Sequence, residues 1–333
     1  MLTSRPPRHA PDVADPAGVR VSRWPVLRDR GGNVRGYTQY ASFDIPLPLR
    51  LLFRRFDVVV AESPPTTALI SGAVAALRRR PLVYYAADVW TDGVIAMGAP
   101  RPVVSLMRSM ERAVLRRAAR VLSISDEVSE RLAALGADRE RIAVVGNGVD
   151  TDVFTPDADP AAPGEQYFVY TGTMSEWQRP DLFVRAFAQI ADEHPELRLR
   201  FFGQGAVESD LRELADALAP GRVLFGGVVG PEESARWIRG AVAALVSIVP
   251  GIGYDFARPT KTYAAAACGT PVIFAGAQVG GDLVRDAGLG EAVEFTPDAV
   301  ADAMRRMLAG ARSGDSAARR RERAEWARRT VSL

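Results

Sequence analysis

The sequence predicts an α/β fold built from two Rossmann-like domains, and three observations carry this prediction. From about residue 56 onward, short apolar runs alternate with amphipathic stretches, which is typical of buried parallel strands connected by helices. A stretch rich in Pro, Ala and Asp interrupts the alternation at residues 155–166, after which it restarts. A length of 333 residues is sufficient for two separate cores. We therefore expect two doubly wound domains joined by a linker.

The first predicted domain, residues 1–154, has four strand patterns and an incomplete beginning. Strands are predicted at residues 56–63, 81–88, 120–125 and 141–147, and helices at 66–79, 103–119 and 126–135. The residues before 56 are predicted to be rich in loops, because no apolar strand, glycine-rich turn and helix follow one another there. A doubly wound sheet grows outward from its first strand, so we expect a domain that lacks its first βα unit.

The second predicted domain, residues 167–312, is complete, and a basic helix follows it at 313–333. Strands are predicted at residues 167–172, 197–203, 222–227, 241–248, 270–276 and 291–295, and helices at 208–218, 231–239 and 297–309. Open α/β sheets bind ligands at the carboxyl ends of their strands. Two such domains are therefore expected to face a cleft that holds the ligand.

Composition excludes several classes of protein. With 47% hydrophobic residues, 25% charged residues and a net charge of +2, the chain does not have the strongly basic balance of a nucleic-acid binder. The single cysteine, Cys268, excludes a disulfide framework. The longest apolar run, near residues 241–249, is far shorter than the roughly 20 residues of a membrane span. We expect a cytoplasmic protein, and attachment to the inner face of the cell membrane remains an open alternative.

The chain's single lysine lies in the first turn of a predicted helix within "RPTKTYAAAACGTPVIF", residues 258–274. Thr260 is the expected N-cap, Gly269 suits the left-handed position beyond the helix, and Pro271 prevents continuation. A cation there faces the positive end of the helix dipole, which costs a few tenths to about 1 kcal/mol. Lys261 therefore indicates an anionic ligand. The alternative is that its side chain turns into solvent.

Five stretches in a fixed order resemble family 4 glycosyltransferases, the retaining sugar transferases of the GT-B fold. They are "RIAVVGNGVDTDVFTP" (141–156), "YFVYTGTMSEWQRPDLFVRAF" (167–187), "LRLRFFGQGAVESDLRELA" (197–215), "RVLFGGVVGPEESARWIRGAVAALVS" (222–247) and "GTPVI" (269–273). The resemblance covers about residues 50–330. It is strongest to the bacterial exopolysaccharide and O-antigen branch, which has a similar Asp-x-Trp, here Asp88 and Trp90.

The resemblance implies a donor site on the second domain. Gly172, Gly203 and Gly205 follow predicted strands and precede helices whose amides can receive phosphate oxygens. Where many family members have an arginine and a lysine for the donor diphosphate, this chain has Thr173 and Gln178. Where many have two glutamates, it has Phe256 and Ala264. Lys261 is then the main cation left for a diphosphate. The remaining residues expected to bind the donor are Arg179, Arg258, Pro259, Thr260 and Tyr263.

On the first domain, Glu62 and Asp88 end neighbouring predicted strands, and with Trp90 they are the expected acceptor-side residues. Asp88 is the candidate catalytic group, as a contact to the acceptor hydroxyl or a general base. The alternative is that it caps the following turn. The predicted helix at 103–119 places Leu106, Met110, Val114 and, one turn on, Arg117 near one stripe, with Arg108, Arg112, Arg116 and Arg120 elsewhere. Such a helix suits either an anionic lipid surface or ordinary packing on the sheet.

We therefore expect a hexosyltransferase-type enzyme (EC 2.4) that uses a nucleotide diphosphate sugar. Its acceptor would be a glycan, a lipid-linked sugar or a small molecule in polysaccharide or glycoconjugate biosynthesis. No metal, other cofactor or nucleic acid is implied, because no cluster of residues has metal-ligand spacing. Two alternatives are a catalytically silent binding or regulatory protein and a transferase whose first domain a partner chain completes. A sugar-nucleotide epimerase would need more carboxylates and a histidine.

Overall fold

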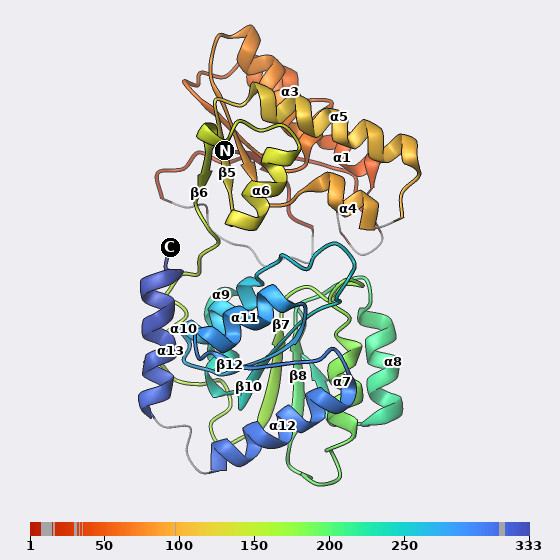
Figure 1. Ribbon diagram of the computed structural model, residues 1–333, viewed down its shortest axis with the longest axis vertical. Coiled ribbons are helices and arrows are strands. Elements are labelled where there is room, and N and C mark those ends of the chain that lie inside the picture. The colour runs from red at the N-terminus through yellow and green to blue at the C-terminus, as the bar shows by residue number, and fades with distance from the viewer. Residues whose placement is uncertain are drawn as a thin grey trace. The chain divides into compact units, whose positions relative to one another are not determined.

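The computed structural model describes residues 1–7, 15, 17–29, 32, 34, 36–96, 98–312 and 317–333. These residues form two compact units, Met1–Gly146 and Asn147–Leu333 (Figure 1). Each unit is built around a parallel β sheet with helices on its faces, which confirms the predicted fold class. The units divide after Gly146, earlier than the predicted linker. Part of that linker is bound within the second unit, because the buried Arg239 guanidinium donates to the backbone oxygens of Thr155 and Asp159.

The second unit contains a six-stranded parallel sheet in the order β12-β11-β10-β7-β8-β9. Its strands are β7 (Tyr167–Thr171), β8 (Arg198–Phe202), β9 (Val223–Phe225), β10 (Ala243–Ile248), β11 (Val272–Gly276) and β12 (Gly290–Val293). The chain runs outward from β7 in one direction and then returns to β10 on its other side. The gap between the carboxyl ends of β7 and β10 is thus the switch point where Rossmann-like sheets bind ligands.

Helices cover both faces of this sheet (Figure 1). They are α7 (Asp181–Ala188), α8 (Glu208–Leu218), α9 (Pro231–Gly240), α10 (Thr260–Ala267), α11 (Gln278–Asp286), α12 (Pro297–Arg312) and α13 (Ala317–Thr330). Phe168 and Tyr170 of β7 pack in a cluster with α7, α8 and α12. Tyr167 and Val169 point the opposite way, into a cluster with α9, α10, α11 and α13. All four side chains are fully buried, as expected for a central strand with two covered faces.

The basic C-terminal helix packs on α10. Buried Arg323 donates from Nε to the backbone oxygen of Gly269 (2.9 Å), just beyond the end of α10. Arg320 donates to the backbone oxygens of Arg239 (2.9 Å) and Cys268 (3.3 Å). Two arginines of α13 therefore satisfy carbonyl groups at the carboxyl ends of α9 and α10, which helices leave without internal partners. The arginine content of this helix has a structural role.

Helix α10 begins one residue earlier than predicted. Pro259 occupies the N-cap position without a side-chain hydrogen bond, and Thr260 is the first helical residue. The predicted role of Thr260 as N-cap is therefore wrong, because proline's fixed backbone angle already suits the entry to the helix. The end of the helix is as predicted: Gly269 has a φ of +71°, and β11 follows.

The first unit contains a four-stranded parallel sheet in the order β3-β4-β5-β6. Its strands are β3 (Val59–Glu62), β4 (Leu82–Ala86), β5 (Arg120–Ser123) and β6 (Ile142–Val144). Strands β1 (Leu2–Ser4) and β2 (Ser22–Trp24) form a separate two-stranded parallel sheet. Among the described residues no strand pairs with the outer edge of β3, where Val60 is 62% exposed. That the domain lacks its first βα unit stays a prediction.

The helices of the first unit correct two predictions. They are α1 (Tyr37–Asp44), α2 (Leu47–Leu52), α3 (Pro65–Leu77), α4 (Trp90–Ala96), α5 (Arg101–Arg117) and α6 (Asp126–Ala134), with a short 3-10 turn at Arg139–Arg141. The segment expected to be loops contains α1 and α2. Leu47 and Leu51 of α2 are buried against Val74, and this packing stabilises a helix that its prolines do not suggest in the sequence.

The apolar stripe predicted for the long helix α5 is also wrong. Its buried residues are Met107, Glu111, Val114 and Leu115, and Leu106 is 61% exposed. The helix packs against α3 and α4. The buried face of α5 contains a carboxylate, Glu111. A prediction from the positions of apolar residues therefore does not find this face. The contacts of α5 thus match ordinary packing within the unit.

The left-handed residue that ends α10 provides a test of this packing. Gly269→Ala should lower the free energy of unfolding by about 1–2 kcal/mol, because a side chain strains the left-handed backbone. Its Cβ would also lie only 2.8 Å from the backbone oxygen of Arg320. The matched control is Gly310→Ala in α12, where nothing lies within 4 Å of the new Cβ and a gain of about 0.5–1 kcal/mol is expected. Urea unfolding measures both, and equal effects would contradict the assignment.

Candidate active site

Lys261 lies at the switch point of the second sheet. It is the second residue of α10, which follows β10, and its side chain extends across to the end of β7. The ammonium nitrogen Nζ is 3.4 Å from the backbone oxygen of Thr173 and 3.3 Å from Oε1 of Gln178. It also lies 3.7 Å from the centroid of the Tyr170 ring, within cation–π range. The lysine thus turns inward across the sheet edge, contrary to the solvent alternative.

The electrostatic surroundings of Lys261 favour an anion. In the described part of the chain no carboxylate forms an ion pair with Lys261, and its hydrogen-bond partners are neutral oxygens. Burial lowers the pKa of this ammonium well below its ordinary value. A desolvated cation without a counter-charge is unfavourable, and the positive end of the α10 dipole adds to the cost. A phosphate group bound here would reduce both penalties.

Gln178 is a buried polar side chain that organises this site, with 4% of its surface exposed. The Tyr170 hydroxyl donates to the backbone oxygen of Thr173 (2.6 Å) and lies 2.7 Å from Oε1 of Gln178. The Ser247 hydroxyl of β10 donates to the Gln178 backbone oxygen (2.6 Å). Residue 178 is a position where the family resemblance expects a cation. Here the Gln178 amide contacts the Lys261 ammonium. The lysine of α10 therefore supplies a positive charge next to the position where the family has its cation.

The three predicted glycines allow two loops to approach each other. Gly172 has a φ of +115°, and a Cβ there would lie 2.9 Å from Cε of Lys261. A Cβ on Gly203, whose φ is +123°, would collide with the backbone oxygen of Gly172. One on Gly205 would collide with the backbone of Met174. The glycines thus make room for Lys261 and for contact between the loops after β7 and β8, a reason that the sequence did not reveal.

The other residues predicted to bind the donor differ in their partners and in their burial. The guanidinium of Arg179 pairs with Asp181 at 2.9 Å, so a carboxylate already neutralises it. Tyr263 is 6% exposed and its ring packs toward Trp326 of α13 at 6.3 Å, so the expected donor contact by Tyr263 does not fit its position in the core. Pro259 and Thr260 begin α10 beside Lys261, and Arg258 is exposed just before them.

An aromatic group beside Gln178 was not predicted. The rings of Trp177 and Tyr254 stack with centroids 5.3 Å apart, and Phe256 lies 6.4 Å from Tyr254. The backbone nitrogen of Val249 donates to the Trp177 oxygen (2.9 Å), which connects this loop to the end of β10. All three rings are half-buried. Their signal in the sequence is two aromatic residues in the loop between β10 and α10, together with a tryptophan after β7.

In the first unit, Glu62 and Asp88 lie at the carboxyl ends of neighbouring strands, as predicted. Glu62 is the last residue of β3 and aligns with Tyr85 of β4. Asp88 lies two residues beyond Ala86, the last residue of β4. Burial, with the charges of Glu62 and Asp88, raises the pKa of the Tyr85 hydroxyl. Asp88 is exposed, yet the protein around its carboxyl desolvates it enough to raise its pKa. A raised pKa suits a general base.

Glu111 of α5 is a structural carboxylate that sequence reasoning missed. It accepts from the backbone nitrogens of Trp90 and Thr91 (3.0 Å each) and from the Thr91 hydroxyl (2.5 Å). These donors belong to the free amino end of α4, where a carboxylate is favourable. Burial nevertheless raises the pKa of Glu111. The contact fixes Trp90, whose ring meets Tyr40 edge-on at 5.7 Å. Glu111 therefore holds the segment that follows Asp88.

Comparisons with known proteins identify the family. The sequence-family model of the glycosyl transferase 4-like domain matches residues 1–148. The family model of glycosyl transferases group 1 matches residues 165–310. A D-inositol 3-phosphate glycosyltransferase of Mycobacterium sp. (strain JLS) is 30% identical over 310 residues, which are 84% of this chain and 67% of the relative. The chain belongs to the family 4 glycosyltransferases.

The chain spans about half the length of most of the curated relatives it matches. The D-inositol 3-phosphate glycosyltransferase of Pseudarthrobacter chlorophenolicus, for example, is 33% identical over 49% of this chain and 41% of the relative. Among solved structures, Anabaena HepE in complex with UDP and glucose has a TM-score of 0.70 and 15% identity, covering 94% of this chain and 82% of HepE. At this identity the likeness shows the fold, which is GT-B.

The described residues contain neither a candidate metal site nor a candidate membrane span. No group of three or more His, Cys, Asp or Glu side chains among them is placed to hold a metal ion. No described helix has the length and apolar composition needed to cross a bilayer. That the family 4 chain works without a metal remains a prediction.

The lowered pKa of Lys261 predicts how diphosphate binding depends on pH. The protonated lysine binds the anion, so affinity for UDP should be full below the pKa of the free protein and fall as pH rises through it. Binding in that pH range should take up a proton. Lys261→Arg should remove this dependence, because a guanidinium does not titrate there. Calorimetry at several pH values, in buffers of different ionisation heat, measures it. An identical pH profile for both proteins would contradict this role.

Proposed function

We propose that this protein is a retaining glycosyltransferase that moves a sugar from a nucleotide diphosphate sugar to a glycan, a lipid-linked or a small-molecule acceptor. The observation that carries the proposal is the ammonium group of Lys261, which lies at the switch point with neutral partners. Family membership supports a sugar-transfer reaction. Anabaena HepE, which shares the fold, forms a complex with UDP and glucose, and this supports a nucleotide sugar as the donor.

In the proposed reaction, the bond between the sugar's anomeric carbon and the diphosphate oxygen breaks. A new bond forms between that carbon and the acceptor oxygen on the same face of the sugar. Negative charge grows on the leaving diphosphate, and Lys261 with the first amides of α10 would stabilise it. The acceptor hydroxyl's proton passes to the leaving diphosphate or to the Asp88 carboxylate. The chain then needs no metal for the leaving group.

Polysaccharide or glycoconjugate assembly is the proposed setting, as in the exopolysaccharide and O-antigen branch. The Asp88 and Trp90 pair supports that branch, whereas the names of the relatives, D-inositol 3-phosphate glycosyltransferases, favour a small phosphorylated acceptor. Glu62, Asp88 and Trp90 are the proposed acceptor-side residues. Exposed arginines on α5, such as Arg116 and Arg117, support attachment to an anionic membrane surface.

A second candidate function is a catalytically silent GT-B protein that binds a ligand or regulates a partner, or one completed by a partner chain. Uncharged Thr173 and Gln178 favour it, because the resemblance expects cations at both positions. The unpaired edge of β3 among the described residues also favours it. The two functions differ in one measurement: a transferase releases UDP or another nucleoside diphosphate from a sugar donor, and a silent protein only binds it.

The donor assignment is tested with Lys261→Met, which retains the length of the side chain and removes its charge. UDP affinity should fall at least about tenfold, the loss expected when a charged hydrogen bond to phosphate is removed. Turnover of sugar donors should fall with it. The control is Arg179→Met, which should change affinity less than about twofold because Asp181 already holds Arg179. Unchanged UDP affinity in Lys261→Met would overturn the donor site. Wild-type UDP binding without turnover of any donor would favour the silent protein.

The role of Asp88 is tested with Asp88→Asn, which preserves shape and removes the base. Transfer to acceptor should fall at least about tenfold, the lower part of what general-base catalysis contributes, while UDP affinity stays unchanged. In the wild type the transfer rate should rise with pH as the carboxyl loses its proton, at a pH above the ordinary pKa of an aspartate, because burial raises its pKa. The variant should lack this rise. Equal rates and profiles would show that Asp88 only caps its turn.

A further inference from the structure

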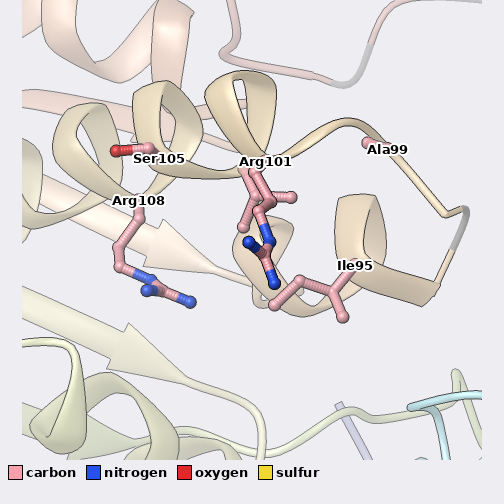
Figure 2. A pocket seen from close by; sticks show the side chains of 6 residues that line it. Ile95, Ala99, Arg101, Ser105 and Arg108 are labelled. Atoms are coloured by element: carbon pink, nitrogen blue, oxygen red, sulfur yellow. The ribbon is translucent and has the colours of Figure 1, made fainter.

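A second cationic site lies in the first unit, between α4 and α5. It is a pocket of about 410 Å³, a size typical of small-molecule sites, lined by Ile95, Ala99, Arg101, Val104, Ser105 and Arg108. Figure 2 shows the two arginine side chains leaving α5 on the same side, with Ile95 approaching from α4. The pocket therefore combines positive charge with an apolar wall.

The spacing of the lining residues explains this arrangement. Arg101, Val104, Ser105 and Arg108 are three or four residues apart along α5, so they share one face of the helix. Arg101 is the first helical residue, and the first turn contains no acidic residue. Its guanidinium therefore adds a positive charge to the positive end of the helix dipole. Nothing in this first turn offsets that charge.

Neither pocket guanidinium is neutralised within the described part of the chain, where neither has a side-chain hydrogen bond or an ion pair. Nearby carboxylates are already used: Asp92 of α4 pairs with Arg131 at 2.7 Å, and Glu111 binds the amino end of α4. Arg108 is also half-buried. Two guanidinium groups that share a pocket repel each other, and an anion between them converts this repulsion into attraction.

We propose that this pocket binds a phosphate ester, with the phosphate on Arg101 and Arg108 and the attached group against Ile95 and Val104. Arginine's planar donors match phosphate oxygens in pairs, which a lysine ammonium does not. The Ser105 hydroxyl is a further donor on the same helix face. That the ester is the acceptor of the transfer rests on the proposed function, whereas binding of the ester does not.

The phosphate can come from a free sugar phosphate or from a lipid headgroup, and the chemistry of the pocket is the same for both. A general attraction of α5 to an anionic membrane is a different proposal. It would use Arg112, Arg116 and Arg117, which are exposed on the same helix. The apolar side chains of Ile95 and Val104 beside the two guanidinium groups favour a phosphate ester over a purely charged surface.

The experiment measures binding of phenyl phosphate to the full chain by ³¹P NMR, with UDP present to occupy the site at Lys261. Phenyl phosphate joins a phosphate to an apolar group, as the pocket requires. Arg101→Gln and Arg108→Gln should each weaken binding at least about tenfold, and the double variant should abolish it at accessible concentrations. Arg117→Gln is the matched control, since it removes the same charge from the last turn of the same helix, and should change affinity less than about twofold.

Two further arms separate the remaining outcomes. UDP affinity should be unchanged in the double variant, which keeps this test independent of the donor site, and an unchanged urea unfolding transition shows that its first unit is folded. Phosphatidylglycerol vesicles replace phenyl phosphate in the other arm: selective loss in the two pocket variants assigns a lipid phosphate to the pocket. Undiminished phenyl phosphate binding in the double variant would overturn the proposal. So would an equal loss in Arg117→Gln, which would indicate general charge attraction.

Discussion

The second unit depends on one unfavourable placement, a lysine ammonium group at the amino end of a helix and over an aromatic ring. Lys261 contacts the Tyr170 ring, the Thr173 backbone oxygen and the Gln178 amide, all of which are neutral. These contacts orient the ammonium without cancelling its charge. The site therefore retains its attraction for an anion, and its neighbours hold the cation where parallel sheets bind phosphates.

Much of the second unit serves to hold α10 in this position. Gly269 follows the end of the helix, and its backbone oxygen accepts from the buried Arg323 of α13. At the other end, Gly172 lacks a side chain where Lys261 passes. Tyr170, a fully buried residue of β7, supplies both the ring under the ammonium and a hydroxyl for the Gln178 network. The residues that pack the core, such as Tyr170, thus also position the charge of Lys261.

Both units contain cations without an internal counter-charge among the described residues, but they differ in chemistry. In the second unit a single ammonium lies among glycines and neutral oxygens at a sheet edge. In the first, two guanidinium groups border a pocket with apolar walls between two helices. Elsewhere arginines such as Arg179 and Arg200 pair with carboxylates at 2.7–2.9 Å. Lys261, Arg101 and Arg108 differ from these paired arginines, and an anionic ligand is favourable at both places.

The sequence by itself determined the order and type of most strands and helices and the family, and it led to the prediction that the lone lysine binds an anion. Apolar periodicity and turn residues are local, so they can be read along the chain. Only the tertiary structure decided that Tyr263 faces the core, that Asp181 holds Arg179, and that α1 and α2 are helices. It also decided that Lys261 meets Thr173, a residue 88 positions away. Such contacts depend on strand order and on which side chains share a face, and neither is written in the local pattern.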